Sequence, residues 1–273
     1  MARYIASWPV NGPSVSPAEQ RAEAAADRLA AAWITQQVSH ATAVSCDPLM
    51  CDALTANGFP ARNVHVLGPT TPYPLTSAVV VVTQAVRELF GSSLSSDYAP
   101  AILAAFGSAD ASITVRVIAP HGAAAYWRQL GADMKARKAV GSDLMGISAI
   151  TVSAKAKQQM LAGQPDARLL LAIAAVASRQ PVDILDFGNI GPRSDQTIPL
   201  RYADLAESDQ AAHMGSSAYV RALRADLGNL GSAGLRPARI VTVVLRSGQA
   251  VLRIEFAAPS PLTLLASQTP PSG

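Results

Sequence analysis

One pattern occurs twice in the chain, in residues 147–189 (ISAITVSAKAKQQMLAGQPDARLLLAIAAVASRQPVDILDFGN) and in residues 78–120 (AVVVVTQAVRELFGSSLSSDYAPAILAAFGSADASITVRVIAP). Each copy begins with a β-branched run, typical of a buried strand. A hydroxyl residue, Ser153 or Thr83, then starts a helical stretch. A glycine, an alanine-rich apolar stretch that we expect to be a second helix, and another β-branched run complete each copy. The pattern predicts two β-α-α-β units, as a duplication would produce.

The stretches around the two copies predict how they are joined. A long amphipathic helix is expected between them, and such a helix is the usual right-handed crossover between parallel strands. Residues 240–245 and 250–256 alternate around a glycine-containing turn, which predicts an antiparallel hairpin. We therefore expect an α/β fold with a mainly parallel sheet, helices on both faces and a C-terminal antiparallel hairpin.

The domain organisation is predicted from turn and composition signals. Residues 1–16 lack periodicity and are expected to be a flexible arm. Residues 17–75 are expected to form a helix and a strand-helix-strand portion, and the proline-rich connection 68–75 ends it. Residues 76–258 would hold the duplicated α/β core with the hairpin. Residues 259–273, rich in Pro, Ser and Thr, are expected to be a disordered tail.

The composition excludes several classes of protein. Hydrophobic residues make up 49% of the 273 residues and charged residues 15%, which is typical of a chain with a large core. The densest basic cluster, Lys135, Arg137 and Lys138, is expected to be the solvated face of a helix. A nucleic-acid surface would need a denser basic stripe with aromatic residues, so we expect no nucleic-acid partner. The longest apolar run, residues 169–177, is too short to cross a membrane.

The only two cysteines, Cys46 and Cys51, are expected at a strand end and in the first turn of the next helix. A disulfide between them is the favoured interpretation, because helical curvature can bring their Cβ atoms into range, and it would indicate an oxidising compartment. A buried pair of free thiols is one alternative. Another is a catalytic thiolate at Cys46, with His40 or His65 as its base and a pKa lowered by the helix N-terminus.

The remaining metal and cofactor signals are weak. The four histidines are His40, His65, His121 and His213, and no two of them have ligand spacing. The cysteines lack two further soft ligands, so we expect no metal site. No glycine-rich dinucleotide motif, phosphate loop or nucleophile elbow is present, so we expect no cofactor.

A candidate ligand-binding rim follows from the expected sheet, because ligands bind beyond the C-terminal ends of strands in open α/β sheets. The polar residues expected at these ends are Asp47, Thr83, His121, Ser153, Asp186 and Asn189. Thr83 and Ser153 have a structural alternative as helix N-caps, and Asp186 can instead accept bonds from loop amides. The Ser, His and Asp residues are too scattered to indicate a triad, so no catalytic residue is assigned.

Several short motifs carry a resemblance to a group of membrane proteins. They are VSCDPLMC at 44–51, VLGPT at 66–70, SAVVVV at 77–82, YAP at 98–100, FGS at 106–108, IAP at 118–120, FGN at 187–189 and FAAPSP at 256–261. Together they resemble the C-terminal extracytoplasmic region of single-pass membrane proteins from Streptomyces-like actinobacteria. The resemblance implies a domain on the outer face of the cell membrane, tethered by a membrane segment outside this chain. It implies no catalytic residues.

These observations lead to one functional expectation and three alternatives. We expect a non-catalytic extracytoplasmic module of a membrane-anchored envelope protein, which binds a protein partner or a cell-envelope component. One alternative is an accessory membrane factor for a large envelope machine such as a contractile injection system. Another is a hydrolase-type enzyme at the strand-end rim, which needs at least two polar groups to converge in a pocket. A structural spacer would bind nothing.

Overall fold

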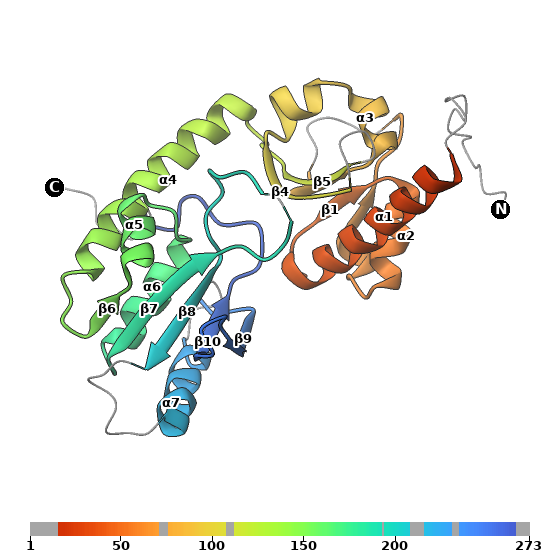
Figure 1. Cartoon of the computed structure of the whole chain (residues 1–273). Coiled ribbons are helices and arrows are strands. Elements are labelled where there is room, and N and C mark those ends of the chain that lie inside the picture. The colour runs from red at the N-terminus through yellow and green to blue at the C-terminus, as the bar shows by residue number, and fades with distance from the viewer. Residues whose placement is uncertain are drawn as a thin grey trace.

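The computed structural model describes residues 16–70, 76–107, 112–192, 194–207, 216–230 and 235–265. The expected flexible arm therefore lies, apart from its last residue, outside the described residues. The described elements form two halves, each built on a five-stranded sheet (Figure 1).

The first half contains, in chain order, α1 (Pro17–Gln37), β1 (Val44–Cys46), α2 (Pro48–Ala56), the 3-10 helix η1 (Ala61–Asn63), β2 (Val64–Val66), β3 (Val79–Val82), α3 (Gln84–Phe90), the π-helix η2 (Leu94–Tyr98), β4 (Ala101–Phe106) and β5 (Ile113–Val117). The second half contains α4 (Ala123–Leu144), β6 (Ile150–Val152), α5 (Ala154–Leu161), α6 (Ala167–Ala177), β7 (Val182–Gly188), β8 (Tyr202–Glu207), α7 (Ser216–Gly228), β9 (Arg239–Val244) and β10 (Ala250–Glu255).

The α/β class is confirmed, but the strands form two mixed sheets and not one mainly parallel sheet. The first sheet has the order β2-β1-β3-β5-β4 and the second has the order β6-β7-β8-β10-β9. Among the described strands, β1 pairs in parallel with β2 and β3, and β6 pairs in parallel with β7. The other neighbours are antiparallel. The expected hairpin is confirmed as β9 and β10.

The expected duplication is right for its second copy and wrong for its first. Residues 150–188 form the β-α-α-β unit, with β6 parallel to β7. In the first copy, the stretch expected to be the second helix is the strand β4, and β5 runs antiparallel to β3. Pro100 and Gly107 bound this apolar run, which leaves it six residues, a usual strand length. The corresponding run in the second copy has 11 residues and is α6.

A different repetition relates the two halves. Each half follows the order α-β-α-β-β-α-β-β when α5 and α6 are counted as one helical connection and η1 and η2 are set aside. The last three strands of each half also have the same arrangement, β3-β5-β4 and β8-β10-β9, with antiparallel neighbours throughout. The halves differ at the other end of the sheet, where β1 lies beside β3 but β7 lies beside β8.

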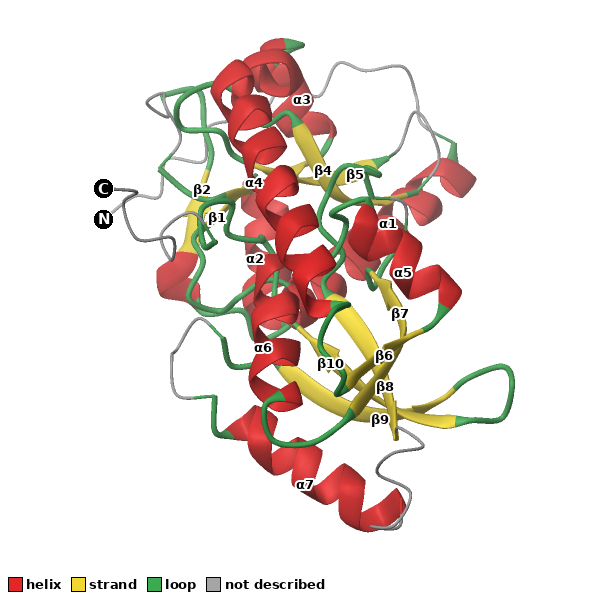
Figure 2. Ribbon diagram, turned by 90° about the vertical axis from the view of Figure 1, so that its left-hand side faces the viewer, coloured by secondary structure: helices red, strands yellow, loops and turns green. Residues whose placement is uncertain are grey.

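The two sheets are covered differently. In the first sheet, α1 and α2 contribute to the core on one face, while α3 and η2 pack over Val80 and Val82 on the other. In the second sheet, α5, α6 and α7 share one core with the inner face, and Figure 2 shows α6 and α7 along one side of the strands. The opposite face carries polar side chains such as Asp204 and Arg253, as antiparallel sheets allow. Helices on both faces are therefore found only in the first half of the described chain.

The expected internal boundary at 68–75 does not separate the sheets. β1 and β3 lie on either side of this connection and pair with each other. The chain passes from one sheet to the other through α4, the long helix that leads from the first half to the second in Figure 1. The part of the connection at 71–75 lies outside the described residues.

Loops of the second half bind the first half directly. The indole Nε1 of Trp33 donates to the carbonyl of Ile190 at 2.7 Å. The backbone N–H of Ile102, on the edge strand β4, donates to Asp195 Oδ2 at 2.7 Å. Val38, directly after α1, forms a parallel β-bridge with Ala258 in the segment after β10. The polar loop after β7 thus protects the β4 edge of the first sheet.

Residues 259–265, the first part of the expected disordered tail, pack onto the folded chain. Leu262 packs against the core of the first half, and Leu265 is only 7% exposed. These apolar side chains bring residues 259–265 onto the folded chain, so the expectation is wrong for this stretch. Residues 266–273 lie outside the described part of the chain.

Candidate functional site

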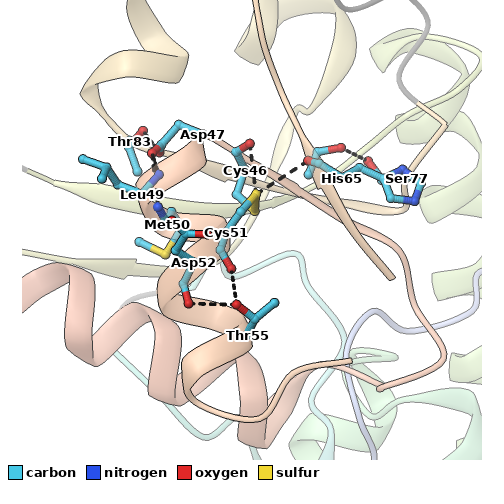
Figure 3. The surroundings of a disulfide bond; sticks show 11 residues. Cys46, Asp47, Leu49, Met50, Cys51, Asp52, Thr55, His65, Ser77 and Thr83 are labelled. Carbon is cyan, nitrogen blue, oxygen red and sulfur yellow. Dashed lines mark hydrogen bonds between the residues drawn. A yellow bond between two sulfur atoms is a disulfide. The ribbon is translucent and has the colours of Figure 1, made fainter. Parts of the chain in front are cut away.

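The cysteine pair forms a buried disulfide at the junction of β1 and α2. Cys46 is the last residue of β1, and Cys51 lies one turn into α2, because Asp47 caps the helix and Pro48 is its first residue. Their Cα atoms are 5.4 Å apart, and the two residues are 0% and 3% exposed. Figure 3 shows the disulfide and its surroundings. The predicted disulfide is confirmed. The alternatives of free thiols and of a Cys46 thiolate with His40 or His65 as its base are wrong for this structure.

Two of the predicted rim residues meet beside the disulfide. Asp47 Oδ1 accepts hydrogen bonds from the backbone N–H groups of Leu49 and Met50, at 3.0 and 3.2 Å, and so caps α2. Its other oxygen, Oδ2, accepts a 2.7 Å bond from Thr83 Oγ1 (Figure 3). Thr83 Oγ1 in turn accepts from the N–H of Val86 and caps α3. Both side chains are therefore committed to helix caps at the ends of the adjacent parallel strands β1 and β3.

Three further rim residues lie at the second sheet. Ser153 Oγ caps α5 by accepting from the N–H of Ala156 at 3.1 Å, and it donates to the carbonyl of Leu185 at 2.5 Å. Asp186 Oδ2 accepts from Lys155 Nζ at 2.6 Å. Asn189 Oδ1 accepts from both the backbone N–H and Nε of Arg201, each at 3.1 Å. These bonds hold strand ends and loops in place. For Ser153 they confirm the structural alternative, a helix N-cap.

The remaining rim residue, His121, is exposed in the turn before α4. The predicted rim is thus divided. Asp47 and Thr83 lie on the first sheet, while Ser153 and Asp186 lie on the second. A single ligand-binding rim was expected because the sequence predicted a single sheet. The two β-α-β units instead belong to separate sheets, so their strand ends do not form a common edge.

The structure shows a hollow that the sequence did not indicate. It has a volume of about 380 Å³ and is lined by Val82, Arg87, Gly91, Ser92, Leu94, Ser95, Ser112, Thr114 and Arg116. The two arginines are 29 positions apart in the sequence, on α3 and on β5. One sequence signal was present. Thr114 and Arg116 alternate with the apolar residues of β5, which marks a polar patch on one face of a strand.

A different arginine binds the two halves together from a buried position. Arg201 is 3% exposed, and its guanidinium lies 5.7 Å from the ring centre of Trp33 on α1. Burial lowers the pKa of Arg201 to about 10. Its backbone N–H also bonds to the carbonyl of Gly188, so this side chain is part of the architecture and not of an open site.

The described residues offer neither a metal cluster nor a membrane helix. No group of three His, Cys, Asp or Glu side chains within them is arranged to hold a metal ion. None of the described helices is long and apolar enough to span a bilayer. Comparisons of the chain with known protein families, with curated proteins and with solved structures found no match.

Proposed function

We propose that this chain is a non-catalytic module that works outside the cell membrane, where it binds a protein partner or a component of the cell envelope. The observation that carries the proposal is the buried Cys46–Cys51 disulfide. Disulfides persist in oxidising compartments, whereas the cytosol keeps ordinary protein thiols reduced. The sequence resemblance to tethered outer-face domains supports the same location.

The bonding of the rim residues supports a binding role over a catalytic one. An enzyme at the rim would need at least two polar groups that converge on one substrate. Asp47 and Thr83 are tied into two helix caps, and Ser153 is tied into a third. Asp186 pairs with Lys155. The side chains that a hydrolase would use therefore hold strand ends in place, and they do so on two different sheets.

The finer proposal, an accessory role in a large envelope machine such as a contractile injection system, rests on the resemblance alone. In that role the module would be tethered through a membrane segment outside this chain. It would recruit or brace a partner at the outer surface.

Retention on envelope material tests the proposed function. The purified chain, with its disulfide intact, would be passed over immobilised cell-envelope fractions from the producing cells. A matched sample of an unrelated disulfide-containing domain of similar size and charge serves as the control. We expect saturable retention of the chain and none of the control. Equal retention of the two would sink the proposal.

A further inference from the structure

The hollow in the first half lies on the face of the sheet that α3 and η2 cover only in part. Val82 is the register partner of Thr114, and Val80 is the register partner of Arg116, so these residues point to the same face. The valines are buried under α3 and η2 in one apolar cluster. The neighbouring positions on β5 extend beyond this cover, so Thr114 and Arg116 line the hollow beside it.

Arg116 is held so that part of its guanidinium remains uncommitted. Nη1 donates to the carbonyls of Ala99 and Pro100, at 2.8 and 3.4 Å, and Nε donates to Thr114 Oγ1 at 3.3 Å. These bonds fix the guanidinium plane. Within the described part of the chain no bond engages Nη2, which leaves two N–H donors. Thr114 Oγ1 accepts from Arg116, so its own proton is available to a further acceptor.

Arg87 approaches the hollow from α3 and is also fixed by neutral groups. Its Nη1 donates to the carbonyl of Ser112 at 2.5 Å, while Nε and Nη2 donate to Gln84 Oε1 at 3.3 and 3.2 Å. Carbonyl and amide oxygens orient a guanidinium but do not neutralise its charge. Two oriented cations therefore line one hollow.

Neither arginine has an acidic partner at ion-pair distance among the described residues, and no carboxylate lines the hollow. Burial lowers the pKa of both side chains, although Glu23 and Glu88 act on Arg87, and Asp195 acts on Arg116, in the opposite direction. Partial desolvation of a cation is unfavourable when no countercharge lies at ion-pair distance. An anion bound in the hollow would remove this penalty.

We propose that the hollow binds a phosphate group carried by a small molecule or by a lipid headgroup. The planar guanidinium matches two oxygens of a phosphate and is the side chain that proteins use most for this purpose. The hydroxyl of Thr114, which lines the hollow and accepts from Arg116, supplies a further neutral donor. The volume, about 380 Å³, lies at the lower end of the range for small-molecule sites, so it admits a phosphate with a short organic part.

This inference deepens the proposed binding role and rests on it only for the source of the ligand. Free phosphate compounds and phospholipid headgroups present the same group to Arg116. An envelope location would favour the headgroup. The pocket itself depends on the residues that line it and not on the compartment.

Titration calorimetry with inorganic phosphate and with glycerol phosphate tests the site. We expect one saturable site, and Arg116→Gln should weaken it by about tenfold or more, since hydrogen bonds from a charged donor are stronger than those from a neutral one. The matched control is Arg221→Gln, which removes the same charge from an exposed position on α7 and should leave the affinity unchanged.

A second variant keeps the test valid if Arg116→Gln fails to fold. Ser95 is exposed at the rim of the hollow, so Ser95→Glu places a carboxylate there without disturbing the core. This carboxylate should compete with phosphate and abolish binding while the fold is retained. No saturable phosphate binding by the wild-type chain, or equal binding by wild type and Ser95→Glu, would overturn the proposal.

Vesicles distinguish the two sources. Retention on phosphatidylcholine vesicles that contain an anionic phospholipid, lost in Ser95→Glu, would assign the headgroup. Binding of glycerol phosphate without vesicle retention would assign a small phosphate compound. The phosphate site and the proposed function can also be refuted separately. Envelope retention without phosphate binding would refute the phosphate site. Phosphate binding without envelope retention would refute the envelope role.

Discussion

The two halves of the molecule share an order of elements but are stabilised by different interactions. The first half has a buried disulfide and a sheet covered on both faces, and no ion pair forms within its described residues. The described residues of the second half form six ion pairs, of which Arg137–Asp133, Arg168–Asp166 and Arg253–Asp204 have acidic side chains with at most 2% exposure.

The two halves differ in the partners of their charged side chains. In the second half, the buried carboxylates of Asp133, Asp166 and Asp204 each have an arginine at hydrogen-bond distance, and the bonds of Arg168 and Arg253 to their carboxylates are bidentate. The first half instead leaves Arg87 and Arg116 beside a hollow with neutral acceptors only. Unlike the arginines of these three pairs, Arg87 and Arg116 line a hollow, as the proposed phosphate site requires.

Breaking the most deeply buried ion pair should have the largest effect on the free energy of unfolding. Arg137 is 1% exposed, bonds to Asp133 Oδ2 at 2.7 Å, and also donates to the carbonyls of Gly163 and Pro165. Arg137→Met would leave a buried carboxylate without its cation, and we expect a loss of about 3–5 kcal/mol in the free energy of unfolding. Denaturant unfolding measures this loss. Arg128→Met, exposed on the same helix, is the control and should have little effect.

The pH dependence of this variant gives a second check. Burial raises the pKa of Asp133, and Arg137 opposes that effect. Without Arg137, the folded-state pKa should rise further above the unfolded value. A carboxyl with a raised folded-state pKa loses stability as pH rises through that pKa and regains it as pH falls. The deficit of Arg137→Met should therefore be smaller near about pH 4 than near about pH 7. A deficit independent of pH would contradict this explanation.

Removing the disulfide should have a smaller effect, confined to the first half. A loop as short as that between Cys46 and Cys51 should stabilise the fold by about 2 kcal/mol through the unfolded state. Cys46→Ala combined with Cys51→Ala should show this loss. Hydrogen exchange by mass spectrometry should locate faster exchange in peptides of β1 and α2. Faster exchange across β8 and β10 as well would mean that the halves do not differ as described.

Removing one helix N-cap from each half compares the two halves with a smaller perturbation. Ser153→Ala should cost about 1 kcal/mol, the usual value for a lost N-cap. Asp47→Ala should cost about 2 kcal/mol, because it also removes the acceptor of the Thr83 hydroxyl. Thermal unfolding of the two variants measures the difference. Equal losses would show that the bond between Asp47 and Thr83 does not link the two caps energetically.

The smallest effect is expected at an exposed ion pair. Lys155 Nζ lies 2.6 Å from Asp186 Oδ2, but the lysine side chain is 66% exposed. Exposed pairs contribute about 0–1 kcal/mol, so Lys155→Met should change the free energy of unfolding by less than about 0.5 kcal/mol. A loss as large as that of Arg137→Met would refute the view that burial decides the strength of these pairs.

Local signals in the sequence predicted the features that depend on neighbouring residues. The hydroxyl residues Thr83 and Ser153 were recognised as possible caps because an N-cap bonds to amides only two or three positions ahead. The disulfide was predicted because the two cysteines are five positions apart. The hairpin β9–β10 was predicted because polar and apolar residues alternate around a short turn. In each case the partners are close in the sequence.

The sequence could not predict features that depend on distant partners. Arg137 was expected on a solvated helix face because two lysines flank it, but the carbonyls of Gly163 and Pro165, on another segment, bury it. The stretch that forms β4 has an alanine-rich, helix-like composition, and its pairing with β5 and with residues of the loop after β7 makes it a strand. The hollow was missed because Arg87 and Arg116 meet only in the folded sheet.

The state of the two cysteines in the producing cells tests the central claim most directly. Cells would be lysed in an alkylating reagent, and the intact mass of the chain would be measured before and after reduction. A protein that works outside the membrane should show no alkylation before reduction and two alkylated cysteines after it, at Cys46 and Cys51. Two cysteines alkylated without reduction would contradict both the disulfide and the extracytoplasmic location.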